Sequence, residues 1–495
     1  MKIAGVLTAA LLLASVCPAA QTPNASPAVV PQSVTAVKVV LANQADLSGA
    51  FALTTKAARG QYVYNALTTL AAQTQPAVLQ AISQMGLIGT PYYIANFILV
   101  QAPAGQTISS LQLSQLQGRP DVASIESVTT FNTNLPAPNA PAVSSLPPGR
   151  GIEKNIQFIN APAVWAQGVQ GQGVTIGFVD TGVQTRHPLL RANYRGKSST
   201  GNNDNFNWWD AVHATLTSGS NPCGTSSSVP CDDTGHGTHI TGTALGGNGN
   251  DYQIGVAPQA KFIACRDMDR GYATTGANFE ECMQFMLAPW DLTGQNADYT
   301  KAPDIVVHPY HCSVPGASCV DDPVMHMVYW NLYAAGITSV VAAEDSGSIC
   351  GSQAAWPQTY PMAVVVGALD YDEGDGNPAI TIAPYSSIGL AQGSVFKPGV
   401  ASPGTQILSA SLNGNVALMT GTSVAAAQVA GSFALAISAN PFVQGKPEQL
   451  WRLVGGLNPK LVDVGTCGTP SGSPNLLYGW GNLDASVLLH VENIE

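Results

Sequence analysis

Three short segments of the chain carry residue types that together can hydrolyse a peptide bond. Asp180 ends an apolar run in F-V-D-T-G, and Gly182 permits a sharp turn after it. His236 lies between glycines in D-T-G-H-G-T-H, where a helix is expected to begin. Ser423 follows a glycine in G-T-S-V-A-A-A and opens an Ala-rich helical stretch. In this order, the three residue types match the orienter, base and nucleophile of serine hydrolysis.

The chemistry explains why all three types are needed. A serine hydroxyl is too weak an acid to attack a carbonyl group unaided, so a neutral imidazole must take its proton. A buried carboxylate must hold that imidazole in the correct tautomer. A helix that begins at Ser423 adds backbone N–H groups and a favourable dipole near the developing oxyanion. Each segment alone also has a plainer reading, in which Asp180 is a turn residue and Ser423 a helix N-cap.

Three other patterns suggest different chemistry. Two D-T-G triplets, at 180–182 and 233–235, are typical of aspartic proteases, although the second follows Cys-Asp rather than an apolar strand. His308, His311 and the cysteine after it have the residue types of a metal site. The run G-Q-G-V-T-I at 171–176 has the glycines of a dinucleotide loop, but they precede the expected strand instead of following it.

The elements that must position these residues are short apolar strands alternating with helical stretches. Buried strands separated by helices indicate a doubly wound parallel sheet covered by helices on both faces, an α/β fold. The expected strands are 174–179, 261–264, 304–307, 338–343 and 363–367.

Composition limits the classes of function. The chain has 495 residues, with 19 Lys and Arg against 30 Asp and Glu, so the formal net charge is −11. This acidic balance argues against a nucleic-acid partner, which requires a basic face. Charged residues are only 10% of the chain, and hydrophobic residues are 45%, which excludes a disordered protein.

The N-terminal third divides into segments of different character. Residues 1–20 have the short basic start, apolar run and small residues of a secretory signal peptide. Residues 21–35 are a polar spacer, 36–133 a small α+β domain, and 134–150 a Pro-rich linker open to cleavage. The α/β domain then covers 151–495, and no later apolar stretch is long enough to predict a membrane span.

The cysteines favour an oxidising compartment. Nine are present, and without Cys17 in the signal sequence an even number, eight, is left, which predicts disulfides in a secreted chain. Sequence alone does not fix their pairing. The pairs that we expect are Cys223–Cys231, Cys312–Cys319, Cys265–Cys282 and Cys350–Cys467.

The chain contains, in this order, the motifs D-T-G, H-G-T-H-x-x-G-T and G-T-S-x-A-x-x-x-V-A-G. These motifs resemble those of the subtilisin-like serine peptidases. Further segments of the chain resemble the bacillopeptidase F-like branch of that family. The resemblance covers roughly 152–490. It implies that Ser423 is the nucleophile, His236 the general base and then acid, and Asp180 the orienting carboxylate. Residues 36–133 resemble the inhibitory propeptide of the family, which assists folding, blocks the cleft and is removed near the linker.

Several positions depart from the family pattern around the substrate. Asp345 occupies the place of an asparagine that donates a hydrogen bond to the oxyanion. A carboxylate there repels the oxyanion, whereas a protonated Asp345 can donate, which predicts activity shifted to acidic pH. Tyr310, His311 and Glu344 are expected to line and alter the substrate pocket. Leu189 stands where a calcium-ligating aspartate is usual in the family, which puts the usual calcium site in doubt. We therefore expect no cofactor, with calcium as the one alternative.

These observations predict a secreted serine endopeptidase, extracellular or periplasmic, synthesised as a self-inhibited precursor. The alternative is a catalytically degenerate subtilisin fold that binds proteins or only processes itself. The expected partners are protein or peptide substrates and the chain's own propeptide, with no nucleic acid and no membrane span, and we expect a monomer.

Overall fold

The computed structural model describes residues 33–128, 130–136, 151–216, 221–247, 252–274, 278–310, 322–353, 356–372, 379–389, 397–457, 467 and 473–489. Its N-terminal unit is a four-stranded antiparallel sheet in the order β3–β4–β2–β6, with two helices packed on it. The bounds are β2 Ala36–Leu41, β3 Ile88–Tyr92, β4 Phe97–Gln101, β6 Val122–Ser127, α1 Lys56–Gln84 and α2 Ser110–Gln117. The α+β character expected for this unit is confirmed.

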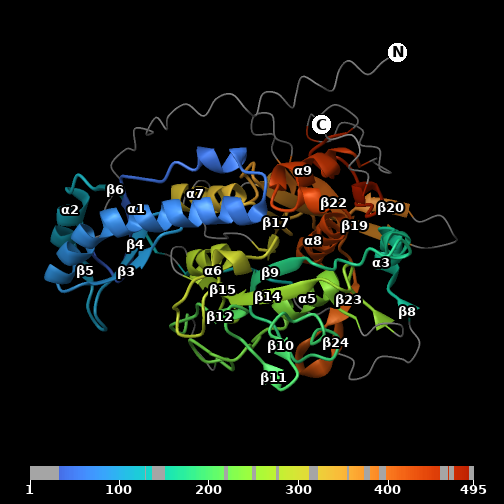
Figure 1. Ribbon diagram of the computed structural model, residues 1–495, viewed down its shortest axis with the longest axis horizontal. Helices are drawn as coiled ribbons and strands as arrows, with labels where there is room; N and C mark the ends of the chain where they lie inside the picture. The colour runs from blue at the N-terminus through green and yellow to red at the C-terminus, as the bar shows by residue number, and fades with distance from the viewer. Residues whose placement is uncertain are drawn as a thin grey trace, which may run out of the picture.

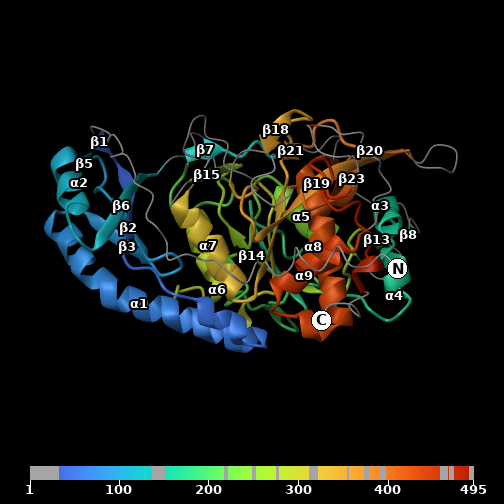
Figure 2. The same ribbon diagram turned by 90° about the horizontal axis from the view of Figure 1, so that it is seen from above.

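Helix α1 links the N-terminal unit to the rest of the protein. It begins after Thr55, whose side chain accepts a hydrogen bond from the Ala58 N–H, and it continues through Pro76. The C-terminal half of α1 contributes Val78 and Ile82 to the core under the small sheet. The N-terminal half extends past that sheet and lies along the larger part of the molecule (Figures 1 and 2).

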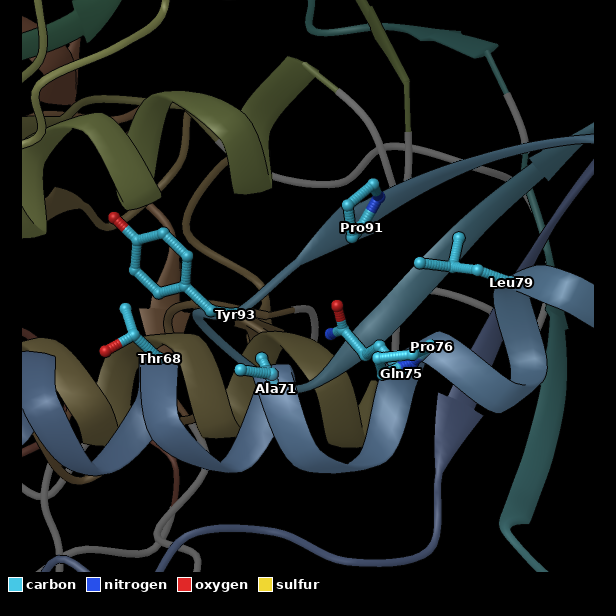
Figure 3. Close-up of a pocket in the computed structure, with 8 residues that line it drawn as sticks. Thr68, Ala71, Gln75, Pro76, Leu79, Pro91 and Tyr93 are labelled. Atoms are coloured by element: carbon cyan, nitrogen blue, oxygen red, sulfur yellow. The ribbon is translucent and has the colours of Figure 1, made fainter.

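A small groove of about 270 Å³ lies between α1 and β3. Figure 3 shows Thr68, Ala71 and Gln75 of α1 on one side of it, and Pro91 and Tyr93 on the other. None of the site residues expected from the sequence lines this groove, so it is separate from the chemistry developed below.

The larger part of the protein is built on an eight-stranded sheet. The strand order is β12–β14–β9–β16–β17–β19–β20, with β22 also paired to β19. All neighbours are parallel except β19 and β20. The bounds are β9 Thr175–Asp180, β12 Trp208–Asp210, β14 Lys261–Arg266, β16 Ile305–His308, β17 Thr338–Ala342, β19 Ala363–Asp372, β20 Ala379–Ile382 and β22 Val400–Pro403. The five strands expected from the sequence are therefore all present, and so is the doubly wound α/β sheet.

Helices cover both faces of this sheet. Side chains of β9 alternate: Ile176 and Phe178 enter one core with helices α5 and α8, and Val179 enters the other with α6 and α7. This period of two follows from the pleat of a strand that is buried on both faces. The helices are α5 His236–Leu245, α6 Asn278–Leu287, α7 Pro323–Ala334 and α8 Thr422–Ala439.

Short elements complete the described chain. The remaining strands are β1 Ser33–Val34, β5 Ile108–Ser109, β7 Thr130–Asn132, β8 Gly151–Ile152, β10 Lys197–Ser198, β11 Gly201–Asn202, β13 Tyr252–Gln253, β15 Tyr272–Thr274, β18 Cys350–Gln353, β21 Ile388–Gly389, β23 Ile407–Ala410 and β24 Val416–Met419. The remaining α-helices are α3 Lys154–Phe158, α4 Ala161–Trp165 and α9 Pro447–Gly455.

Helix α8 is the central core helix. Among the described residues it is the one helix long and apolar enough to cross a membrane by length and composition, but 89% of that window is buried inside the protein. It packs on α5 and on strands β17, β19 and β22. Its apolar composition is thus explained by the core.

Disulfides join three of the four expected cysteine pairs: Cys223–Cys231, Cys265–Cys282 and Cys350–Cys467. The second ties β14 to α6, and both of its cysteines are fully buried. The fourth expected pair, Cys312–Cys319, lies outside the described residues, as does the segment 1–20. Disulfide bonds of this kind are compatible with an oxidising, extracellular location.

Candidate active site

Asp180, His236 and Ser423 meet in one buried cluster. The Nδ1 atom of His236 lies 2.8 Å and 2.9 Å from the two carboxylate oxygens of Asp180. Its Nε2 atom lies 3.1 Å from Ser423 Oγ. The three residues are 0%, 1% and 2% exposed. With Asp180 beside Nδ1, the neutral imidazole carries its proton there and presents Nε2 to the serine as an acceptor.

The local sequence explains this arrangement. Asp180 is the last residue of β9, and His236 is the first residue of α5. A Cβ atom on Gly237 would lie 2.1 Å from the Gly182 carbonyl oxygen and 3.1 Å from the Cβ atom of Asp180. Glycine at 237 therefore allows the start of α5 to approach the end of β9 closely enough for the imidazole to reach the carboxylate.

Asp232 fastens these two elements together, a role not foreseen from the sequence. Its Oδ1 accepts hydrogen bonds from Thr181 Oγ1 (2.9 Å) and Gly235 N (2.8 Å), and its Oδ2 accepts from Thr238 N (2.9 Å) and Oγ1 (2.6 Å). Burial raises the pKa of Asp232 to about 6, although these hydrogen bonds oppose that rise. The available signal was an aspartate four residues before His236, at the start of a glycine-flanked helix.

The buried histidine on the next turn of α5 has no catalytic partner. His239 Nε2 lies 3.1 Å from the carbonyl oxygens of Ile407 and Ala417. Burial lowers the pKa of His239 to about 3, with a smaller contribution from His236. The imidazole is therefore neutral and links α5 to the β23–β24 pair.

The two D-T-G triplets do not form an aspartate pair. Asp180 contacts His236, whereas Asp233 accepts from Arg266 Nη2 at 2.7 Å and from the Arg270 N–H at 3.0 Å. An aspartic protease requires two carboxyl groups that share a proton. The described geometry disfavours that alternative.

Asp345 lies beside the nucleophile. Its Oδ1 accepts a hydrogen bond from the Thr422 N–H at 2.8 Å. A Cβ atom on Gly421 would meet Asp345 Oδ2 at 2.8 Å and Ser423 Oγ at 3.3 Å, so these two oxygens border the same small space. The residue is exposed. Position 345 thus borders the space beside Ser423, and the group there is a carboxyl.

Glu344 is held in an unusual backbone conformation next to Asp345. Its φ is +91°, in the left-handed region that favours glycine. Its N–H donates to Thr422 Oγ1 at 3.1 Å, and its Oε1 accepts from Gln358 Nε2 at 3.0 Å. The side chain is only 8% exposed. A carboxyl group is therefore directed into the interior at the residue before Asp345.

The other expected pocket residues are placed differently. Tyr310 is 2% exposed and packs edge-on against His308 and Phe279. His308 is buried, with its Nδ1 2.7 Å from the Tyr329 hydroxyl. His311 lies outside the described residues.

The described part of the chain contains no group of three or more His, Cys, Asp or Glu side chains suited to a metal ion. Leu189 is 3% exposed in the apolar core, so that position offers no carboxylate to calcium.

The chain segment after the N-terminal unit lies in the candidate site. Strand β7 pairs antiparallel with β15. Thr133 then donates from its N–H and its Oγ1 to the Gly271 carbonyl oxygen, at 2.9 and 2.8 Å. Farther along, Pro136 Cγ lies 3.0 Å from the same Gly421 Cβ position that borders Ser423. The segment thus approaches the nucleophile as an added strand.

A buried ion cluster joins the N-terminal unit to the large domain. Lys38 of β2 is fully buried, and its Nζ lies 3.1 Å from Asp322, 3.3 Å from Glu280 and 3.3 Å from Glu126. Burial lowers the pKa of Lys38, but the surrounding carboxylates, Asp322 first, outweigh it and hold this pKa well above its ordinary value. Nearby, Gln284 accepts hydrogen bonds from two consecutive backbone N–H groups of the N-terminal unit.

Comparisons with known proteins agree with this geometry. A sequence profile of the Subtilase family matches residues 171–481. Bacillopeptidase F of Bacillus subtilis (strain 168) is 30% identical over 407 residues, which are 80% of this chain and 26% of that protein. The major intracellular serine protease of the same strain is 27% identical over 57% of this chain and 74% of its own length. Subtilisin NAT of Bacillus subtilis subsp. natto is 27% identical over 59% of this chain and 62% of its own length.

This chain therefore spans about a quarter of the length of Bacillopeptidase F and under two thirds of subtilisin NAT. The family profile nevertheless covers more than half of it, including all three residues of the buried cluster. The chain belongs to the subtilase family.

Proposed function

We propose that this chain is a serine endopeptidase in which Ser423 is the nucleophile, His236 the general base and Asp180 the residue that orients it. The observation that carries the proposal is the continuous buried contact from Asp180 through His236 to Ser423. Relatives named as serine proteases support the same activity.

The proposed reaction follows from these positions. Ser423 Oγ bonds to the carbonyl carbon of the substrate peptide as its proton passes to His236 Nε2, and the carbonyl electron pair moves onto oxygen. His236 then gives that proton to the leaving nitrogen as the C–N bond breaks. Water releases the acyl group by the same route, and Asp180 stabilises the imidazolium in both steps.

Stabilisation of the oxyanion depends on the protonation of Asp345. The start of α8 supplies backbone N–H groups and a positive dipole end at Ser423. Since Asp345 Oδ1 accepts the Thr422 N–H, a proton on this carboxyl would reside on Oδ2, which borders the nucleophile. We therefore propose that activity is favoured at acidic pH.

We further propose that residues 36–133 are an inhibitory propeptide and that the protein is exported. Pairing of β7 with β15 and the position of Pro136, which borders the same space as Ser423 Oγ, support inhibition, because this segment would compete with a substrate for that space. The three disulfides support export. Removal of the propeptide near residues 134–150 would open the site.

A fluorophosphonate probe, which reacts only with an activated serine, tests the activity. Precursor and processed protein are labelled at about pH 4.5, near the ordinary pKa of a carboxyl group, and at about pH 7.5. We expect labelling of the processed form, stronger at the lower pH, and weak labelling of the precursor. Ser423→Ala should abolish it, and Ser432→Ala, on the same buried helix, should leave it unchanged.

One observation favours a second function. A carboxylate at Asp345 is a poor neighbour for an oxyanion, which favours a subtilase fold that binds proteins without turnover. Absence of Ser423-dependent labelling in the processed form at both pH values would support that reading and contradict the proposed peptidase.

A further inference from the structure

A second aspartate lies directly beside the triad aspartate. Asp267 immediately follows β14, and its N–H donates to the carbonyl oxygen of Asp180 at 3.1 Å. The two residues therefore stand at the ends of adjacent parallel strands. Asp267 is 0% exposed, and the proposed reaction does not use it.

The surroundings of Asp267 compensate a negative charge only weakly: its own backbone N–H and the Arg266 cation favour the charge, but burial and the Asp180 carboxylate outweigh them. Within the described part of the chain, neither carboxylate oxygen has a hydrogen-bond partner. Among the described residues, the charged or titratable groups that interact electrostatically with it are Asp180, Glu280, Tyr329 and Arg266.

Among the described residues, neither Arg266 nor Lys38 donates a hydrogen bond to Asp267, although the buried Nε of Arg266 has no partner. The Nη1 and Nη2 atoms of Arg266 donate to Asp210 and Asp233. Lys38 contacts Glu280. An ionised carboxylate at 267 would thus be buried, without a partner, and next to another anion, which is strongly unfavourable.

We infer that Asp267 is held as a neutral carboxylic acid beside Asp180, and that loss of its proton sets the alkaline limit of the active conformation. It is a positioning residue, because it acts through Asp180 and not on the substrate. Burial and then the Asp180 carboxylate raise the pKa of Asp267 well above its ordinary value, in agreement with this assignment.

The direction of the pH effect follows from proton linkage. In the unfolded chain this carboxyl loses its proton near its ordinary pKa, about 3.9. Between that pH and its raised native pKa, the folded protein holds one proton more. The ratio of folded to unfolded protein contributed by this group is therefore greatest at low pH, and it falls about tenfold for each unit of pH across that window.

Two measurements on the full-length chain test the inference. An infrared difference spectrum between the Ser423→Ala protein and its Asp267→Asn derivative at about pH 7, above the ordinary carboxyl pKa, should contain the C=O stretch of one protonated carboxylic acid. Denaturant unfolding at a series of pH values upward from about pH 5 should show the protein with Asp267 losing stability relative to Asp267→Asn, about tenfold in the folded ratio for each pH unit until the native carboxyl ionises. Asp291→Asn, at a partly exposed aspartate whose hydrogen bonds hold its pKa below the ordinary value, is the control and should produce neither change.

A third measurement links the group to catalysis. In proteins with Ser423 intact and with Asp345→Asn, which removes the proposed effect of the Asp345 proton, the alkaline limb of kcat/KM should move to higher pH when Asp267→Asn is added. This activity readout rests on the proposed function, whereas the infrared band and the unfolding curves do not. Failure of the peptidase proposal alone would leave those two results unchanged.

Asp267→Val is a second variant, to be used if Asp267→Asn fails to fold. A neutral side chain without polar partners can be replaced by an apolar one, so this variant should fold. Absence of the carboxylic acid band, parallel pH dependence of stability with and without Asp267, or failure of both variants to fold would each overturn the inference.

Discussion

The two sides of Ser423 differ in character. On the His236 side the side chains are buried and tightly bonded, and Asp232 ties the end of β9 to the start of α5 through four hydrogen bonds. On the other side lie Asp345, which is exposed, and Glu344, whose backbone has a left-handed conformation that glycine adopts more easily. In the proposed reaction, the groups that activate Ser423 are therefore all in place, while the group beside the oxyanion acts only when it is protonated. Activation and charge stabilisation are separable here, and substitutions can test them separately.

The largest expected effect is on the His236 side. Asp180→Asn should lower kcat about 10⁴-fold, because an amide beside Nδ1 favours the wrong imidazole tautomer while the geometry is kept. Steady-state hydrolysis of a casein-derived peptide by the processed protein measures it. Thermal unfolding should show that the variant is folded, and a loss below tenfold would contradict the orienting role of Asp180.

An intermediate effect is expected on the opposite side. Asp345→Asn supplies a donor at every pH and should raise kcat at neutral pH by about 10²- to 10³-fold, while activity near pH 4 changes little. The pH profile of kcat measures this difference. An identical profile in both proteins would contradict a role for the Asp345 proton, and a fall at neutral pH would mean that the carboxylate itself is needed.

The smallest effect concerns Glu344. Glu344→Gly and Glu344→Ala both remove the contact with Gln358, but only glycine adopts a φ of +91° without strain. We expect the glycine variant to be the more stable by about 1 kcal/mol. Chemical denaturation of the two variants measures the difference, and equal stabilities would show that the backbone relaxes at this position.

The parts of the fold predicted from sequence are those with strong local signals. The buried strands are continuous apolar runs, and Asp180, His236 and Ser423 each adjoin glycines at an element end. Helix α1 gave no comparable signal, because it contains Pro76 and Gly60 and has no acidic residue in its first turn. Packing on two separate surfaces stabilises it instead, which a local pattern does not record.

The burial of charged side chains was the other feature that the sequence did not predict. Lys38 lies in A-V-K-V-V-L, where a lysine normally indicates a solvent-facing position, yet its partners Glu280 and Asp322 come from more than 240 residues away. Asp267 is hidden from sequence reasoning for the same reason. The burial of both depends on the docking of distant elements, and only the assembled structure shows it.

The N-terminal half of α1 has a consequence for the order in which the protein is made. Arg59 is buried, and it donates to the Gly445 carbonyl oxygen at 2.7 Å, a residue 386 positions later in the chain. At synthesis rates of about 5–20 residues per second, Arg59 waits on the order of 20 seconds or longer for that partner. Gly445 and Glu448, a second partner of Arg59, both follow Ser423 in the chain, so this end of α1 docks only after Asp180, His236 and Ser423 have all been synthesised.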